Sequence, residues 1–195
     1  MQNQNPVLTI EQCKAIAQAQ AAGGDFFVFA GKVWDISEHD AKTLAEEWLY
    51  NTSPLGDDAI LTDDILIGWL KETQTELEYD DSYDADYLVL TDSEAEEKAE
   101  EYIKESLWAF NASFLSNVTG FDISIFEAIQ ANDKCEGNNE AILQLVGDNF
   151  DSLVQDAISS DGRSHFLSTY DGNEEEFNCK DYTGENEYLF IYRMN

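Results

Sequence analysis

The chain contains few basic residues, few prolines and few cysteines, and each shortage excludes a class of binding or of structure. Ten Lys and Arg oppose 41 Asp and Glu, so the net charge is −31 over 195 residues and no basic stripe is left for direct binding to nucleic acid or an anionic membrane. Two prolines, with no Pro-, Gly- or Ser-rich stretch, exclude a long flexible linker. Three widely spaced cysteines exclude a disulfide framework, and we expect reduced thiols.

Long apolar runs are missing as well. No window approaches the ~18 consecutive apolar residues that a membrane span requires. The first residues lack the basic region and the apolar run of a signal peptide. We therefore expect a cytoplasmic protein, in the host-cell cytoplasm if a phage encodes it.

Aromatic residues and hydrophobic periodicity, by contrast, are plentiful. Apolar residues make up 43% and aromatic residues 12%, more than an acidic disordered chain contains, so we expect a folded protein. Thr9 and Gln12 form a capping box at the start of a helix. The β-rich runs 26–29 and 33–36 predict a hairpin.

The rest of the chain is expected to be mainly helical. Ser93 and Glu96 form a second capping box, and we expect the longest helix to run from Ser93 to about Leu115. Alternating residues predict strands at 164–170 and 188–192. The predicted fold class is α+β, helix-dominated, with short strands near both ends: an N-terminal hairpin and C-terminal antiparallel strands.

Two regions are expected along the chain. Residues 1–78 hold the N-terminal helix, the hairpin and further helix, and residues 79–195 hold an acidic loop, the long helix, shorter helices and the C-terminal strands. One compact domain is the alternative, because no linker separates the regions. The sequence leaves both a monomer and a homodimer open.

The negative charge is concentrated as well as large. Between Asp57 and Glu101, 17 acids face only Lys71 and Lys98. Duplex DNA carries one negative charge per ~1.7 Å of axis, and counterions condensed on it are released when a basic groove closes over it. A folded protein that holds carboxylates at comparable density can occupy such a groove. The alternative is that the charge is a solvated surface that only keeps the protein soluble.

Two acidic helical stretches carry a resemblance to a known class of proteins. Leu44-Ala-Glu-Glu-Trp48 followed by Asp63-Asp-Ile-Leu66 is similar to acidic helical stretches of the ArdA antirestriction proteins. In size, net charge and small acidic helices the chain resembles the DNA-mimic anti-defence proteins of phages and mobile elements, typified by Ocr and ArdA. The resemblance implies a non-enzymatic inhibitor that blocks the DNA site of a restriction enzyme, a CRISPR effector or another nucleic-acid-handling defence complex.

Such an inhibitor would bind a basic nucleic-acid-binding protein through fixed carboxylates. Residues three and four apart on a helix lie ~5–6 Å apart at Cβ, close to the spacing of phosphates along a strand. We expect four acids in a loop and four on the long helix to form this contact. The expected partner-binding residues are Asp80, Asp81, Asp84, Asp86, Glu94, Glu97, Glu101 and Glu105.

No metal and no cofactor are expected. With Asp80 as position 1 of an EF-hand loop, Ala85 stands where Gly is required and Thr91 where a bidentate Glu is required, so the motif fails. The cysteines and the two histidines lack the spacing of zinc ligands.

Two other functions stay open. One is an acidic interaction or assembly module with an apolar interface, whose binding would not respond to salt. The other is a small hydrolase-like enzyme centred on His165, Tyr170 and Asp171, because a His beside carboxylates can serve as a general base.

Overall fold

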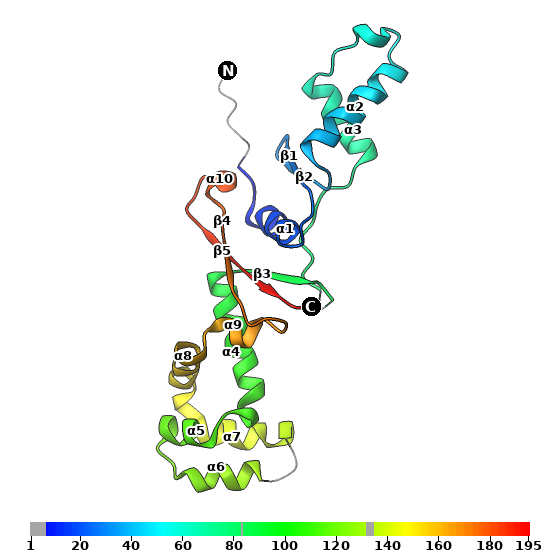
Figure 1. Cartoon of the computed structure of the whole chain (residues 1–195). Coiled ribbons are helices and arrows are strands. Elements are labelled where there is room, and N and C mark those ends of the chain that lie inside the picture. The colour runs from blue at the N-terminus through cyan, green and yellow to red at the C-terminus, as the bar shows by residue number, and fades with distance from the viewer. Residues whose placement is uncertain (1–6, 83, 132–134) are drawn as a thin grey trace. The chain divides into compact units, whose positions relative to one another are not determined.

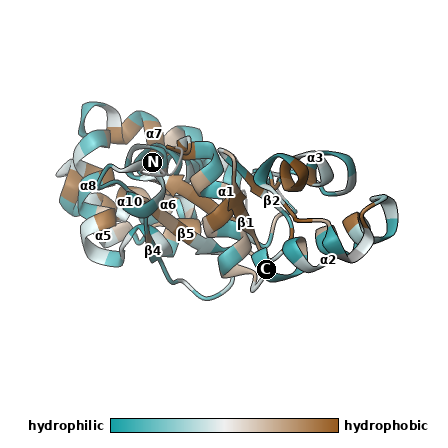
Figure 2. Cartoon of the chain, turned by 90° about the horizontal axis from the view of Figure 1, so that it is seen from above, coloured by the Kyte–Doolittle hydropathy of each residue, from teal (hydrophilic) through white to brown (hydrophobic). Residues whose placement is uncertain are grey.

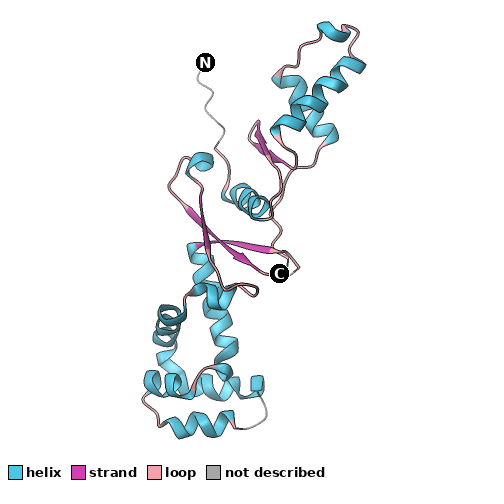
Figure 3. Cartoon of the chain, in the orientation of Figure 1, coloured by secondary structure: helices cyan, strands magenta, loops and turns pink. Residues whose placement is uncertain are grey.

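The computed structural model describes residues 7–82, 84–131 and 135–195 (Figure 1). It confirms the predicted helix-dominated α+β class, with one two-stranded and one three-stranded sheet among the described residues (Figure 3). The chain divides into two compact units. Unit 1 comprises the residues up to Leu90 together with Glu175–Asn195, and unit 2 is Thr91–Glu174. The chain therefore leaves unit 1 and later returns to it.

Unit 1 begins with the capped helix that the sequence predicts. The Thr9 side chain accepts a hydrogen bond from the Gln12 backbone, and the Gln12 side chain accepts one from the Thr9 backbone at 3.0 Å. Ala30 and Gly31, both at positive φ, join two strands in the predicted hairpin. The elements of unit 1 are α1 (Ile10–Ala21), β1 (Phe27–Phe29), β2 (Lys32–Trp34), α2 (Glu38–Thr52), the 3-10 turn η1 (Gly56–Asp58), α3 (Asp63–Thr73), β3 (Tyr87–Thr91, ending at the boundary), β4 (Glu175–Asn178), α10 (Lys180–Thr183) and β5 (Tyr188–Arg193).

Neighbouring residues of β2 enter two different hydrophobic clusters, because successive side chains of a strand point to opposite faces. Val33 packs in the α1 cluster and Trp34 in the α2–α3 cluster, and each is only 1% exposed. In Figure 2, β5 and the β1–β2 hairpin include hydrophobic residues, coloured brown. The α1 cluster is Leu8, Cys13, Ile16, Ala17, Val33, Val89, Cys179, Leu189 and Ile191. The α2–α3 cluster is Phe27, Trp34, Ala41, Ala45, Leu66, Trp69 and Leu70.

The three-stranded sheet has the order β3-β5-β4, so β5 is its central strand. β5 was predicted from its alternation, and Leu189 and Ile191 are indeed buried. β4 was not predicted. The sequence indicates a long acidic loop there, yet Glu175–Asn178 pairs antiparallel with β5, from Glu175 opposite Ile191 to Asn178 opposite Tyr188.

Unit 2 is helical throughout its described residues. The inward face of its first helix carries Ala95, Ala99 and Ile103, all fully buried, as the four-residue spacing predicts. The small alanines let neighbouring helices approach closely. The elements are α4 (Asp92–Ser106), η2 (Leu107–Ala109), α5 (Ala112–Thr119), α6 (Ile123–Gln130), η3 (Cys135–Asn138), α7 (Asn139–Val146), η4 (Gly147–Asn149), α8 (Phe150–Asp161) and α9 (Arg163–Leu167).

The prediction of one long helix from Ser93 to about Leu115 is wrong at both ends, because α4 runs from Asp92 to Ser106. The N-cap is Thr91 rather than Ser93, because the Thr91 side chain accepts from the Glu94 backbone and the Glu94 carboxylate accepts from Thr91 N at 2.7 Å. The helix ends at Ser106, and Phe110 adopts an extended conformation ahead of α5.

The break after α4 is held by side-chain amides from elsewhere in unit 2. Asn139 donates to the Lys104 carbonyl at 2.7 Å, and Gln130 donates to the Phe110 carbonyl at 2.6 Å and to the Trp108 carbonyl at 3.1 Å. These bonds satisfy carbonyls that a continuous helix would have paired internally. The tertiary contacts therefore compensate for the break.

The segment 164–170, predicted as a strand, is not one: its first four residues belong to the short helix α9, and residues 168–170 lie in a loop and bend. Gly162, at φ 81°, separates α9 from α8. The Arg163 side chain, which is 14% exposed, then donates to Asp92 at 2.6 Å and to Glu174 at 3.3 Å. This ion-pair cluster joins the first residue of α9 to the first residue of α4 and to the last residue of unit 2.

Candidate partner-binding surface

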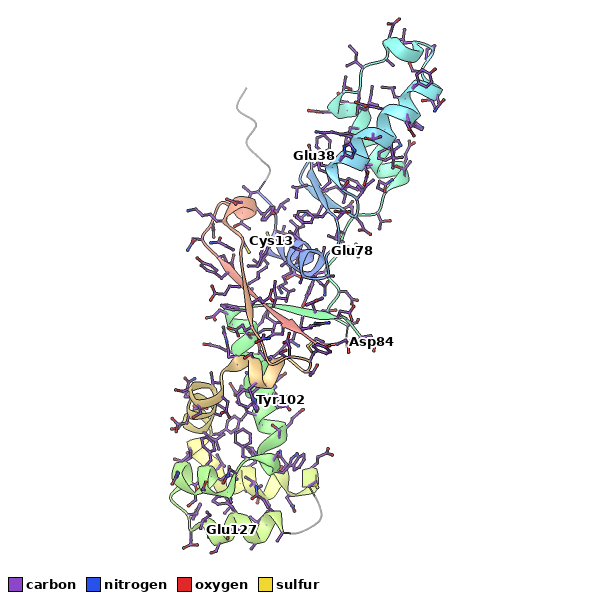
Figure 4. The ribbon with its side chains drawn as sticks, viewed as in Figure 1. Cys13, Glu38, Glu78, Asp84, Tyr102 and Glu127 are labelled. Atoms are coloured by element: carbon purple, nitrogen blue, oxygen red, sulfur yellow. The ribbon has the colours of Figure 1, made fainter. Side chains whose placement is uncertain are left out.

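The loop that carries four of the predicted acids is held by hydrogen bonds near both ends. Gln18 of α1 donates to the Asp80 carbonyl at 2.8 Å and accepts from the Asp80 backbone N–H at 2.9 Å. The Asp86 carbonyl accepts from Met194 N at 2.8 Å. Both ends of the loop are therefore attached to the body of unit 1, and Asp84 lies between them, ahead of β3 (Figure 4).

All four loop acids are exposed. The Ser82 backbone N–H donates to the Asp80 carboxylate at 2.9 Å, and this bond, assisted by the Ser82 side chain, lowers the pKa of Asp80. The loop acids are thus presented to solvent, and hydrogen bonds hold the backbone at the first and the last of them. They are Asp80, Asp81, Asp84 and Asp86.

On α4, three of the four predicted acids form an exposed stripe. Glu97, Glu101 and Glu105 recur every four residues and are exposed. Among the described residues, none of these three takes part in an ion pair or in a hydrogen bond of its side chain. Their carboxylates are therefore available to an incoming cation, and we call these three residues the α4 stripe.

Glu94 does not belong with the α4 stripe. It is half-buried, and its carboxylate is used in the cap of α4, where it also accepts from the Thr91 hydroxyl at 2.9 Å. The structure therefore gives Glu94 a role in starting the helix.

A second row of acids on α4 was missed. Asp92, Glu96 and Glu100 recur every four residues beside the α4 stripe and line a groove between α4 and α8, together with Arg163. Their spacing of four residues was visible in the sequence. The loop acids belong to unit 1 and the two α4 rows to unit 2.

Asp171 and His165, two residues of the enzyme alternative, contact residues close to them in sequence. The Asp171 carboxylate accepts from the Ser168 hydroxyl at 2.9 Å and from Asn173 N at 3.0 Å, so it builds a turn. The His165 ring packs edge-on against Phe166, with ring centroids 5.0 Å apart. Within the described part of the chain, no group of three His, Cys, Asp or Glu side chains could hold a metal ion.

Two of the three thiols are buried together in the α1 cluster. Burial raises the pKa of Cys13, and burial together with the neighbouring Cys13 raises the pKa of Cys179 to about 12. Cys135, by contrast, is exposed.

We expect only Cys135 to react quickly with iodoacetamide in the folded protein at pH 8. The thiolate is the nucleophile, and a pKa of about 12 leaves roughly one Cys179 in ten thousand ionised at that pH. Mass spectrometry of the alkylated chain measures this, and urea-unfolded protein, in which all three thiols react, is the control. Equal labelling of Cys135 and Cys179 in the folded protein would contradict the buried placement.

Comparison with known proteins finds no matching family model, no matching curated protein and no matching solved structure. In the described part of the chain, the helices are all too short or too polar to cross a membrane.

Proposed function

We propose that this protein is a non-enzymatic inhibitor that binds a basic nucleic-acid-binding protein by imitating the charge of DNA or RNA. The observation that carries the proposal is the α4 stripe, where three exposed carboxylates stand on one face of a helix with no basic residue paired to them among those described. An isolated negative surface repels itself and costs stability, so a cationic groove that closes over it gains free energy.

The position of the acids supports imitation better than solubility alone. Charges that only maintain solubility can lie anywhere on the surface, including on unconstrained segments. Here three of the acids lie on a capped helix, which maintains their spacing when a partner arrives, and the loop acids lie on a segment whose backbone is held at Asp80 by Gln18 and at Asp86 by Met194. Preorganised charges lose less entropy on binding than mobile ones.

The partner class follows from this chemistry. A groove built for nucleic acid carries Lys and Arg at phosphate spacing, and a restriction enzyme or a CRISPR effector in the cytoplasm is the target that we propose. The function requires neither catalysis nor a cofactor.

The test is capture of partners from a bacterial lysate on the immobilised full chain at low salt, followed by elution with rising salt and, separately, with duplex DNA. We expect a basic nucleic-acid-binding protein that both agents release, because both compete for the same charges. A captured protein that resists both agents would overturn charge imitation.

A second candidate is favoured by one observation. Unit 1 exposes apolar side chains around α2 and the segment after it, with Leu44 44% and Trp48 39% exposed on α2 and Ile60 77% exposed before α3. Such a patch suits an acidic interaction module with an apolar interface. It predicts capture that withstands high salt, because burial of apolar surface is not screened.

A further inference from the structure

A cavity of about 340 Å³ lies within unit 2, where α4, η2, α5, α8 and α9 meet. Its volume is at the lower end of the range for small-ligand sites. The α4 residues that line it, Tyr102 and Ser106, are not part of the α4 stripe. The cavity is therefore separate from the α4 stripe.

Aromatic rings form much of the cavity wall. Tyr102 and Phe166 have ring centroids 6.1 Å apart, Phe110 and Phe166 are nearly parallel at 6.4 Å, and Phe110 and Phe114 are 5.6 Å apart. Tyr102 is half exposed and projects from α4 (Figure 4). The faces of such rings carry partial negative charge and attract cations.

Two helices also end at this cavity. Ser106 is the last residue of α4 and Asp161 the last residue of α8, and both line the wall. The C-terminal end of a helix carries a partial negative charge that favours a nearby cation. Lys104 already lies in the last turn of α4, so α8 supplies the helix end that no basic residue of its own last turn opposes. Asn111 also lines the wall, but its side chain caps the opposite, positive end of α5 by accepting from Ser113 N at 2.9 Å.

Asp161 is in an unfavourable place for a helix. A carboxylate at the C-terminus opposes the helix dipole, and the last turn of α8 holds no basic residue to compensate. A bound cation would remove this conflict. His165 lies on the same wall of the cavity.

We propose that the cavity binds the guanidinium group of an arginine side chain. Among biological cations the guanidinium is planar, weakly hydrated and always charged, and it stacks on aromatic rings while donating to carboxylate and carbonyl oxygens. Because the function proposed above supplies a basic partner, that partner is the source of the arginine, and this part of the inference rests on the proposed function. The α4 stripe attracts the partner, and the cavity fixes one of its side chains.

The first experiment titrates the blocked amino acid N-acetyl-arginine amide into the full chain at pH 8 and 150 mM salt, followed by the NMR resonances of the Phe and Tyr rings. The citrulline analogue, which has the same shape without the charge, is the ligand control. We expect millimolar binding of the arginine compound, with shifts centred on the cavity rings, and no binding of the citrulline compound. Equal binding of both, or shifts confined to other parts of the chain, would overturn the proposal.

Matched substitutions separate the cavity from the general negative charge. Asp161→Asn and Tyr102→Leu should each weaken binding of the arginine compound about fivefold or more, because one removes the carboxylate and the other the ring. Asp156→Asn removes the same charge from an exposed position of α8 that does not line the cavity, and Tyr102→Phe keeps the ring. Both should leave binding unchanged, and equal losses in the controls would overturn the site.

The second experiment measures binding of the captured partner. The double variant Asp161→Asn/Tyr102→Leu should weaken it about tenfold. If the double variant binds as tightly as the wild type while charge reversal of the α4 stripe destroys binding, the cavity proposal fails and the proposed function stands. If no basic partner is captured although the arginine compound binds, the proposed function fails, and with it the assignment of the arginine to a partner.

Discussion

Reversing the α4 stripe, with Glu97, Glu101 and Glu105 changed together to Lys, is expected to lower affinity for the captured basic partner by about 100-fold or more. Close charge pairs across an interface contribute on the order of 1.5 kcal/mol or more each, and three lysines would add repulsion. The single changes to Gln should each cost only about tenfold, the equivalent of one such pair, because a distributed array keeps its other charges. Titration calorimetry or surface plasmon resonance at two salt concentrations measures both affinity and its salt dependence.

The control reverses three exposed acids of unit 2 that do not share one line, Glu127, Glu140 and Asp148. It changes the net charge by the same amount, so it reports the effect of overall charge alone. We expect it to cost about tenfold at most, mainly through a slower association rate. Imitation by an ordered array is refuted if the control and the α4 stripe variant lose affinity equally, or if one single substitution abolishes binding.

Trp34→Ala is expected to lower the free energy of unfolding by about 3–5 kcal/mol, the usual cost of removing a large aromatic side chain from a core. Trp34 is 1% exposed in the α2–α3 cluster, and its indole N–H donates to the Phe29 carbonyl at 3.3 Å. Its backbone also forms a bridge with Glu76. The loss therefore leaves a cavity and loosens the attachment of both α2 and the segment after α3.

Trp48→Ala is the matched control, because Trp48 is 39% exposed on α2. It should cost about 1 kcal/mol or less, since much of the ring is already in water and Ala favours a helix. Urea unfolding followed by circular dichroism compares the stability of the two variants. The two units of the chain need not unfold together, so the transition of each unit is fitted separately. Similar losses for both variants would show that Trp34 is not a core residue.

Local signals predicted much of the fold. The capping box at Thr9, the hairpin of β1 and β2 and the strand β5 depend on residues close in sequence, and each was confirmed. The exposed α4 stripe was predictable for the same reason, because a spacing of four on a helix fixes a common face.

The predictions failed where the local structure depends on contacts with residues distant in sequence. The end of α4 at Ser106 is maintained by Gln130 and Asn139, which lie 24 and 33 positions later, and no local pattern reveals such bonds. The first residue of the helix α9, Arg163, pairs with Asp92 and Glu174, which lie 71 and 11 positions away. The aromatic cavity was likewise hidden, because its walls come from five elements that only the tertiary fold brings together.

The return of the chain to unit 1 has a consequence for its synthesis. β5, the central strand of the three-stranded sheet, is translated after the whole of unit 2. β3 therefore emerges from the ribosome without its neighbour, and its edge stays open while the helices of unit 2 form. A premature stop in the region of β4 would leave unit 2 complete but remove the strand that joins β3 to β4, so unit 1 can finish folding only after translation has passed β5.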